Sequence, residues 1–174
     1  MSRETTLRKT LIGSFAATVY VLASVGTALA ADAVANLRSP SGQDVGQVTL
    51  IETPHGTLLH AQLRNLPPGP HAFHVHETGK CIPPFGSAGG HFNPTGSGHG
   101  LADDDGAHVG DMPNVHVPAS GSLEQEILNT RLQLNNDLFD NDGASIVMHA
   151  GADDYETNPA GAAGSRIACG VIRR

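Results

Sequence analysis

Apolar and polar residues alternate along several short stretches of this chain, and a period of two is typical of β-strands. In residues 47–52, Val48, Leu50 and Glu52 alternate with Gln47, Thr49 and Ile51, and the turn sequence Thr-Pro-His-Gly follows them. The same reading predicts strands over residues 47–52, 57–63, 72–77, 144–149 and 166–172, with a break at the Leu-Pro-Pro-Gly-Pro of residues 66–70. Because the chain has 21 Gly, 11 Pro and almost no helical pattern, we predict an all-β protein, an antiparallel sandwich or barrel.

Two long segments lack this alternation. Residues 78–118 are rich in Gly, Pro, Asp and His, and residues 151–165 are rich in Gly and Ala. Loops of this length are usually functional or disordered. The first segment contains four of the seven candidate metal ligands described below and one of the two cysteines, so we expect it to be functional.

Residues 122–134 (SLEQEILNTRLQL) are ambiguous. They contain good helix formers at near-helical apolar spacing. A strand here would require the tertiary context to override this propensity, so the structure of this segment stays open.

The N-terminus has the pattern of a secretory signal peptide. Arg3, Arg8 and Lys9 precede an uncharged, largely apolar run over residues 11–25, and Ala28-Leu29-Ala30 has the small-x-small form of a cleavage site. We predict a cleavable signal peptide at residues 1–30 and one domain at residues 31–174, against the alternative of an uncleaved anchor. The protein is therefore expected to be exported.

Charge and cysteine content agree with an exported, soluble product. The formal net charge of −7 repels nucleic acid and anionic lipid, so we expect no nucleic-acid partner and no stable membrane association after cleavage. Cys81 and Cys169 are the only cysteines. In an oxidising compartment they are expected to form one disulfide, worth about 4–5 kcal/mol in the chain-entropy model, rather than two free thiols.

Six histidines and one aspartate form the main chemical signal. His74 and His76 are two residues apart, so both rings project from one face of a strand. The full set of candidates is His74, His76, His91, His99, His108, His149 and Asp111. These exceed the needs of one tetrahedral ion and suffice for two metals if one imidazole serves both. Three nitrogens with a carboxylate suit zinc, and a nitrogen-only set with an open position suits copper. The other mature-chain histidines, at positions 55, 60, 71 and 116, are interpreted as surface or hydrogen-bonded residues.

Four motifs carry a specific resemblance. They are Phe-His-Val-His-Glu at 73–77, Gly-Gly-His-Phe-Asn-Pro at 89–94, His-Val-Gly-Asp at 108–111 and Gly-Ser-Arg-Ile-Ala-Cys-Gly-Val-Ile at 164–172. In their order and spacing the chain resembles copper,zinc superoxide dismutases, from about Ala33 to the C-terminus and most loosely over residues 115–141. The resemblance implies a Greek-key, immunoglobulin-like β-sandwich or flattened barrel with two long functional loops.

The resemblance also implies the site and the reaction. One redox copper per subunit would bind His74, His76, His91 and His149, and one structural zinc would bind His91, His99, His108 and Asp111, with His91 shared. Asp153 would link His74 to His99, Arg166 would lie near the open copper position, and Cys81–Cys169 would hold the adjacent loop. The implied activity is dismutation of superoxide to dioxygen and hydrogen peroxide by alternate reduction and reoxidation of the copper, with His91 carrying a proton.

Other functions remain open. A copper or zinc carrier of the same fold, or a zinc-only structural module, would bind metal without turnover. The acidic run 103–105, the lack of Lys and Arg in residues 151–165, and Lys80 as the only lysine after the leader favour weak long-range attraction of an anion. A homodimer is left open, and the leader favours a bacterial periplasm, with secretion as the alternative.

Overall fold

The computed structural model describes residues 30–104 and 106–174. All but the last residue of the predicted signal peptide, residues 1–30, lies outside this range. Within the described residues, no helix has both the length and the hydropathy needed to cross a membrane.

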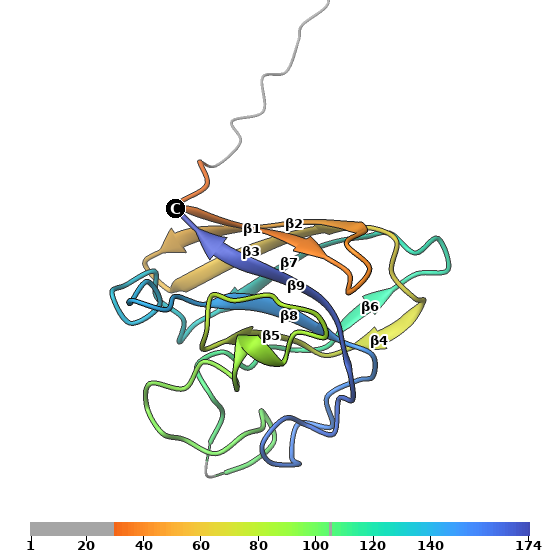
Figure 1. Cartoon of the computed structure of the whole chain (residues 1–174). Coiled ribbons are helices and arrows are strands. Elements are labelled where there is room, and N and C mark those ends of the chain that lie inside the picture. The colour runs from red at the N-terminus through yellow and green to blue at the C-terminus, as the bar shows by residue number, and fades with distance from the viewer. Residues whose placement is uncertain (1–29, 105) are drawn as a thin grey trace, which may run out of the picture.

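The described residues form nine antiparallel strands (Figure 1). They are β1 (Ala33–Arg38), β2 (Asp44–Thr53), β3 (Gly56–Leu63), β4 (Gly69–His71), β5 (Phe73–His76), β6 (Val115–Val117), β7 (Leu123–Asn129), β8 (Ser145–His149) and β9 (Arg166–Arg173). Seven form one sheet in the order β5-β8-β9-β1-β2-β3-β7, and β4 pairs with β6. Neighbours such as β3 and β7 are far apart in sequence, which gives the crossing connections of a Greek-key arrangement.

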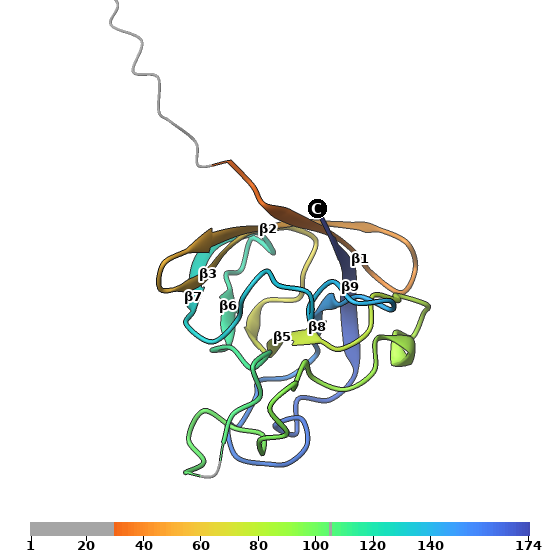
Figure 2. The ribbon, with the colours of Figure 1, turned by 90° about the vertical axis from the view of Figure 1, so that its left-hand side faces the viewer.

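The long sheet curls, as the two views show (Figures 1 and 2), and its concave side encloses the main hydrophobic core. One face of each strand is buried there, because the side chains of a strand alternate between its faces. Leu50, Leu59, Phe73 and Ile146 are among the fully buried members. The segments 78–114 and 150–165 gather at one end of the sheet, and their described residues contain one short 3-10 helix (Gly86–Ala88). This end is where the candidate ligands lie.

The all-β prediction is confirmed, and the ambiguous segment resolves as a strand. β7 occupies residues 123–129 and pairs with β3 from Leu63↔Leu123 to Thr57↔Asn129. Leu123, Ile127 and Asn129 point inward and are buried, whereas Glu124 and Glu126 are exposed. Pairing with β3 therefore overrides the helix propensity of this sequence.

Three strands were not predicted. β1 lies before the first predicted strand, β4 begins inside the stretch interpreted as a chain break, and β6 lies inside the segment interpreted as a loop. β4 and β6 are three residues each and pair with one another, Gly69↔Val117 to His71↔Val115. Pairs this short leave too little alternation along the chain to be recognised.

Candidate metal centre

Strand β5 carries two of the candidate ligands at its edge of the sheet. Phe73 and Val75 belong to the hydrophobic core, so His74 and His76 lie on the opposite face, toward the long loops. β5 pairs with β8, and the register shifts between Met148 and His149 at the end of β8. His149 thereby joins His74 and His76 on the loop side of the sheet.

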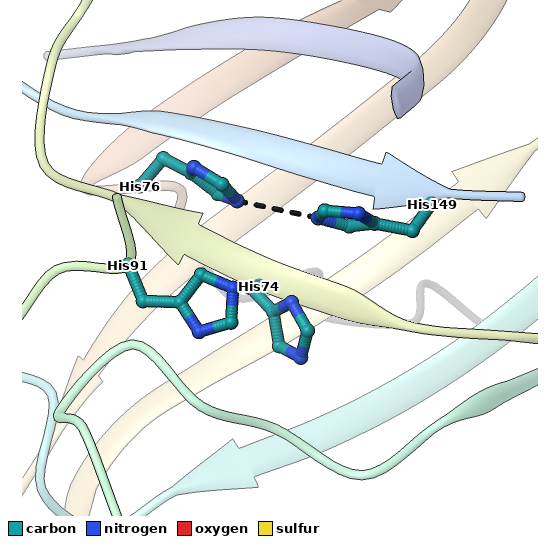
Figure 3. A group of neighbouring side chains, drawn as sticks. All are labelled: His74, His76, His91 and His149. Carbon is teal, nitrogen blue, oxygen red and sulfur yellow. Dashed lines mark hydrogen bonds between the residues drawn. The ribbon is translucent and has the colours of Figure 1, made fainter. Parts of the chain in front are cut away.

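The first ligand group consists of His74, His76, His91 and His149 (Figure 3). All four side chains are buried, and one ring nitrogen of each lies within 4.8 Å of the others. His91 comes from the long loop and is attached to β5 by a β-bridge to His76. The group therefore combines two strands with one loop.

The ring nitrogens of His76 and His149 are arranged for a cation. Each ring places Nδ1 beside a backbone carbonyl, that of Gly89 at 3.0 Å and that of Gly164 at 3.2 Å, so each Nδ1 donates its proton there. The two Nε2 atoms face one another at 3.4 Å, the contact drawn in Figure 3. In neutral rings both Nε2 atoms carry lone pairs, which repel unless a positive ion lies between them.

Burial keeps these rings neutral. Burial, together with the neighbouring His91 and Arg166, lowers the pKa of His76 from 6.5 to about 2 and that of His149 to about 4. Burial also lowers the pKa of His74, although the hydrogen bond to Asp153 opposes this shift. Neutral imidazole is the form that binds metals.

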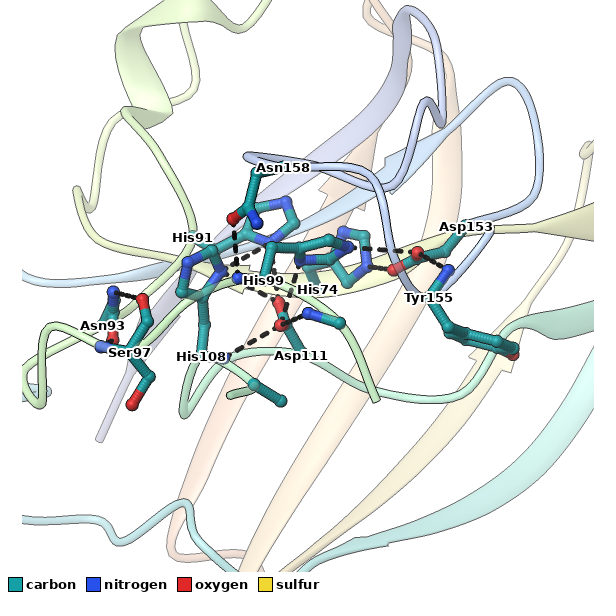
Figure 4. A network of polar contacts seen from close by, with 12 residues as sticks. His74, His91, Asn93, Ser97, His99, His108, Asp111, Asp153, Tyr155 and Asn158 are labelled. Atoms are coloured by element: carbon teal, nitrogen blue, oxygen red, sulfur yellow. Dashed lines mark hydrogen bonds and ion pairs between the residues drawn. The ribbon is translucent and has the colours of Figure 1, made fainter. Parts of the chain in front are cut away.

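The second ligand group consists of His91, His99, His108 and Asp111, again buried and within 4.8 Å of one another (Figure 4). Asp111 is central: its Oδ1 lies 2.7 Å from His91 Nδ1 and 3.3 Å from His108 Nδ1. Its Oδ2 accepts the backbone N–H of His108 at 2.9 Å. Burial raises the pKa of Asp111, but the hydrogen bond from His91 and the nearby histidines lower it below 3.8, so the carboxylate is ionised.

His91 offers one nitrogen to each group. Its Nδ1 lies among the second group, whereas its Nε2 is buried and has no hydrogen-bond partner among the described residues. Nδ1 of His74 and Nδ1 of His99 are likewise buried without a hydrogen-bond partner among the described residues. His99 Nδ1 lies 3.0 Å from Asp111 Oδ2, but without the alignment of a hydrogen bond. Buried polar atoms normally have partners, so these three nitrogens fit two bound metal ions.

Asp153 connects the two groups through hydrogen bonds to one histidine of each. Its Oδ2 accepts a hydrogen bond from His74 Nε2 at 2.8 Å, and its Oδ1 accepts one from His99 Nε2 at 3.1 Å. Burial raises the pKa of Asp153 and the His74 hydrogen bond lowers it, with a net result of about 2. The neighbouring Asp154 is exposed and instead accepts hydrogen bonds from Glu156 and Thr157. The structure thus places only Asp153 of this acidic pair at the centre.

Arg166 lies at the other side of the first group, next to the disulfide. Its guanidinium donates to the carbonyls of Phe85 and Gly89, each at 2.6 Å, and Gly89 also accepts the His76 Nδ1 proton. The predicted Cys81–Cys169 disulfide is present, with the two Cα atoms 5.7 Å apart. It ties the segment that contains both carbonyls to strand β9.

Sequence reasoning missed several residues that contact the ligands or Asp153. Asn158 accepts the backbone N–H of His99, Asn114 binds the backbone of Asp153, and Tyr155 bonds to both Asn114 and Asp153. Apart from the short-range bond between Tyr155 and Asp153, these hydrogen bonds join a side chain to the main chain of a remote segment, and no local motif marks them. The one buried histidine outside the two groups, His71, has both ring nitrogens on carbonyls, those of Pro67 and His149.

Comparison with known sequences agrees with this geometry. Residues 45–172 match the family described as copper/zinc superoxide dismutase. The chain belongs to this family. Relatives include the copper–zinc superoxide dismutase 1 of Aquifex aeolicus, 46% identical over 145 residues (80% of this chain and 86% of that protein). The copper–zinc superoxide dismutase of Caulobacter vibrioides is 44% identical over 148 residues (81% and 85%).

Solved structures of the family share the fold. The copper/zinc superoxide dismutase from Brucella abortus superimposes with a TM-score of 0.70 at 30% identity, covering 82% of this chain and all of that chain (100%). A superoxide dismutase-like protein from Bacillus subtilis gives a TM-score of 0.76 at 36% identity, covering 79% of this chain and 96% of that chain.

Proposed function

We propose that this protein is a copper- and zinc-containing superoxide dismutase that converts superoxide to dioxygen and hydrogen peroxide. Its first ligand group (His74, His76, His91 and His149) would hold copper, and its second (His91, His99, His108 and Asp111) would hold zinc. The observation that carries the proposal is the pair of buried ligand groups that share His91. A four-nitrogen set suits copper, and three nitrogens with one carboxylate suit zinc.

Copper supplies the electron transfer when bound, by cycling between two oxidation states, and zinc supplies a fixed positive charge. The protein positions these ions through hydrogen bonds on the ring nitrogens that face away from them. The Gly89 carbonyl fixes His76, the Gly164 carbonyl fixes His149, and Asp153 fixes His74. The chain thereby sets both the tautomer and the orientation of these rings.

His91 and Arg166 act on the substrate in this proposal. His91 can hold a proton on Nε2 and deliver it to the reduced oxygen species, while Nδ1 stays with the second group. Arg166 uses two N–H groups on carbonyls, and a guanidinium has five, so further donors are available for an anion. Burial lowers its pKa below 12.5, yet the group remains charged in the physiological range.

Long-range attraction of superoxide is expected to be weak. Lys80, the only lysine among the described residues, is exposed next to Cys81. Asp103 and Asp104 make the loop between His99 and His108 acidic. Arg166 is then the cationic side chain that lies beside the first ligand group, through the Gly89 carbonyl that it shares with His76. A rate below that of more strongly steered enzymes follows from this distribution.

Export belongs to the same proposal. A signal peptide at residues 1–30 would deliver the domain at residues 31–174 to the periplasm, where the disulfide can form. A homodimer remains compatible with this function. The mass of the mature protein recovered from the periplasm tests the cleavage after Ala30, because an uncleaved chain would retain its full 174 residues.

Superoxide dismutation by the copper- and zinc-loaded protein, compared with the copper-free protein, tests the activity. Rapid loss of superoxide that depends on copper is the expected result. Arg166→Glu should remove most of the activity while both metals remain bound, and Arg173→Glu, at an exposed position of the same strand, should not. Stoichiometric metal without turnover would instead favour a metal carrier.

A further inference from the structure

Tyr155 lies outside both ligand groups, yet its backbone conformation is unusual. Its φ of 68° is in the left-handed region, which residues other than glycine and asparagine rarely adopt. A bulky residue in this region costs free energy, so it persists where its surroundings hold it. The contacts of the Tyr155 side chain and main chain indicate what holds it.

Three hydrogen bonds join Tyr155 to the residues behind the metal centre. Its phenol oxygen accepts the backbone N–H of Asn114 at 2.8 Å, and its own N–H donates to Asp153 Oδ1 at 2.7 Å. Its carbonyl accepts the backbone N–H of Ala102 at 3.2 Å. Tyr155 thus connects the segment between two proposed zinc ligands, His99 and His108, to Asp153.

Asn114 completes a closed ring of hydrogen bonds. Its side-chain amide donates to the carbonyl of Asp153 and accepts the N–H of Asp153, both at 2.8 Å. The Asn114 side chain therefore bonds both the N–H and the carbonyl of Asp153, as the main chain of a neighbouring strand would. The phenol oxygen of Tyr155 in turn fixes the main chain of Asn114, and Figure 4 shows the Tyr155 main chain close to the Asp153 carboxylate.

Close main-chain packing leaves this arrangement little freedom. A Cβ on Gly100 would lie 2.1 Å from the Tyr155 carbonyl oxygen, and a Cβ on Gly161 would lie 1.9 Å from Asp153 Oδ1. The segment after His99 therefore lies directly against Tyr155. A shift of Tyr155 would move both the Asp153 carboxylate and this segment.

We propose that Tyr155 is a positioning residue: its phenol oxygen, through Asn114, fixes the Asp153 carboxylate on His99 and so slows the release of zinc. The inference rests on the proposed zinc group. It adds a residue that touches neither a ligand side chain nor the metal. Outer partners of ligands commonly change metal affinity 10- to 100-fold, and we expect about a tenfold effect here, equivalent to about 1.4 kcal/mol, the size of one hydrogen bond.

Zinc release from the metal-loaded protein into a chromogenic chelator tests this proposal. Tyr155→Phe removes only the phenol oxygen and should release zinc about tenfold faster than the wild type. Thr53→Val is the matched control, because the Thr53 hydroxyl also accepts a backbone N–H, that of His55 at 3.1 Å, but in the β2–β3 hairpin. It should leave zinc release unchanged even where it lowers the melting temperature of the metal-free protein as much as Tyr155→Phe does.

A double-mutant cycle tests the route through Asn114. Asn114→Ala removes the amide that bonds the Asp153 main chain, so Tyr155→Phe should cause no further acceleration of zinc release in that background. The inference would be overturned if Tyr155→Phe released zinc at the wild-type rate, or if Thr53→Val accelerated the release equally. Additive effects of Tyr155→Phe and Asn114→Ala on the release rate would overturn it as well. A wild-type protein that binds copper but no stoichiometric zinc would contradict the proposed zinc group itself.

Discussion

Replacing Asp153 by asparagine should weaken the binding of at least one of the two metals by about 10- to 100-fold. The carboxylate accepts three N–H donors, from His74 Nε2, His99 Nε2 and the Tyr155 main chain. An amide has only one oxygen, so its NH₂ group must face at least one of these N–H groups. The side chain has 1% relative exposure, so water cannot replace the lost acceptor.

The histidine that faces the NH₂ group must change its tautomer. Its proton then moves from Nε2 to Nδ1, the nitrogen that is otherwise unpartnered in both His74 and His99. A protonated nitrogen has no lone pair for a metal. One lost hydrogen bond to a charged acceptor is worth about 1.5–3 kcal/mol, which corresponds to the expected range in affinity.

Competition with chelators, followed separately for copper and zinc, measures this effect. Asp154→Asn is the matched control: it makes the same chemical change one residue away, at an exposed carboxylate that bonds only within its own turn. It should leave both affinities within about twofold of the wild type, as expected for surface substitutions. Wild-type affinity of Asp153→Asn for both metals would refute the tautomer argument.

Three further predictions follow from the same geometry. Gly161→Ala should accelerate metal loss, because its Cβ would overlap the Asp153 carboxylate. Gly42→Ala, also at a positive φ but in open space between β1 and β2, should cost only backbone strain; equal metal loss in the two would contradict this. In the metal-free protein, burial lowers the pKa of His149 from 6.5 to about 4, so the unfolding free energy should decrease by up to about 3 kcal/mol as the pH falls from 6.5 to 4. Urea unfolding at pH 7 and pH 4.5 measures this loss, and unchanged midpoints would argue against it. Because long-range attraction of superoxide is expected to be weak, the dismutation rate should change little from low to moderate ionic strength, and a steep decrease would show stronger steering.

Much of the fold class could be predicted from the sequence. Short apolar stretches between turn residues predicted β2, β3, β5, β8 and β9 within three residues of their bounds, because such stretches are a local property of the sequence. The disulfide was predicted from cysteine number and compartment alone. The motifs around His74, His91 and His108 supported the family assignment, which the family match over residues 45–172 confirms.

Other features could not be predicted because they depend on partners far along the chain. Residues 123–129 have helix propensity, and only pairing with β3, about 65 residues earlier, makes them a strand. Asp153 and Asp154 are equally acidic in sequence; the resemblance, rather than any local pattern, pointed to Asp153, and the structure buries only Asp153 between two histidines. Asn114 and Tyr155 contact the centre through main-chain hydrogen bonds that leave no sequence motif.

The sequence by itself determined which chemistry is available: many imidazoles, one disulfide, short strands and long loops. The resemblance implied that His91 is shared, but only the tertiary structure decided how the rings are held, with an acceptor on the far nitrogen of His74, His76, His99 and His149. The reason is physical. A strand's period is set by adjacent residues, whereas the direction of a ring nitrogen is set by a carbonyl or carboxylate that folding brings from a distant segment.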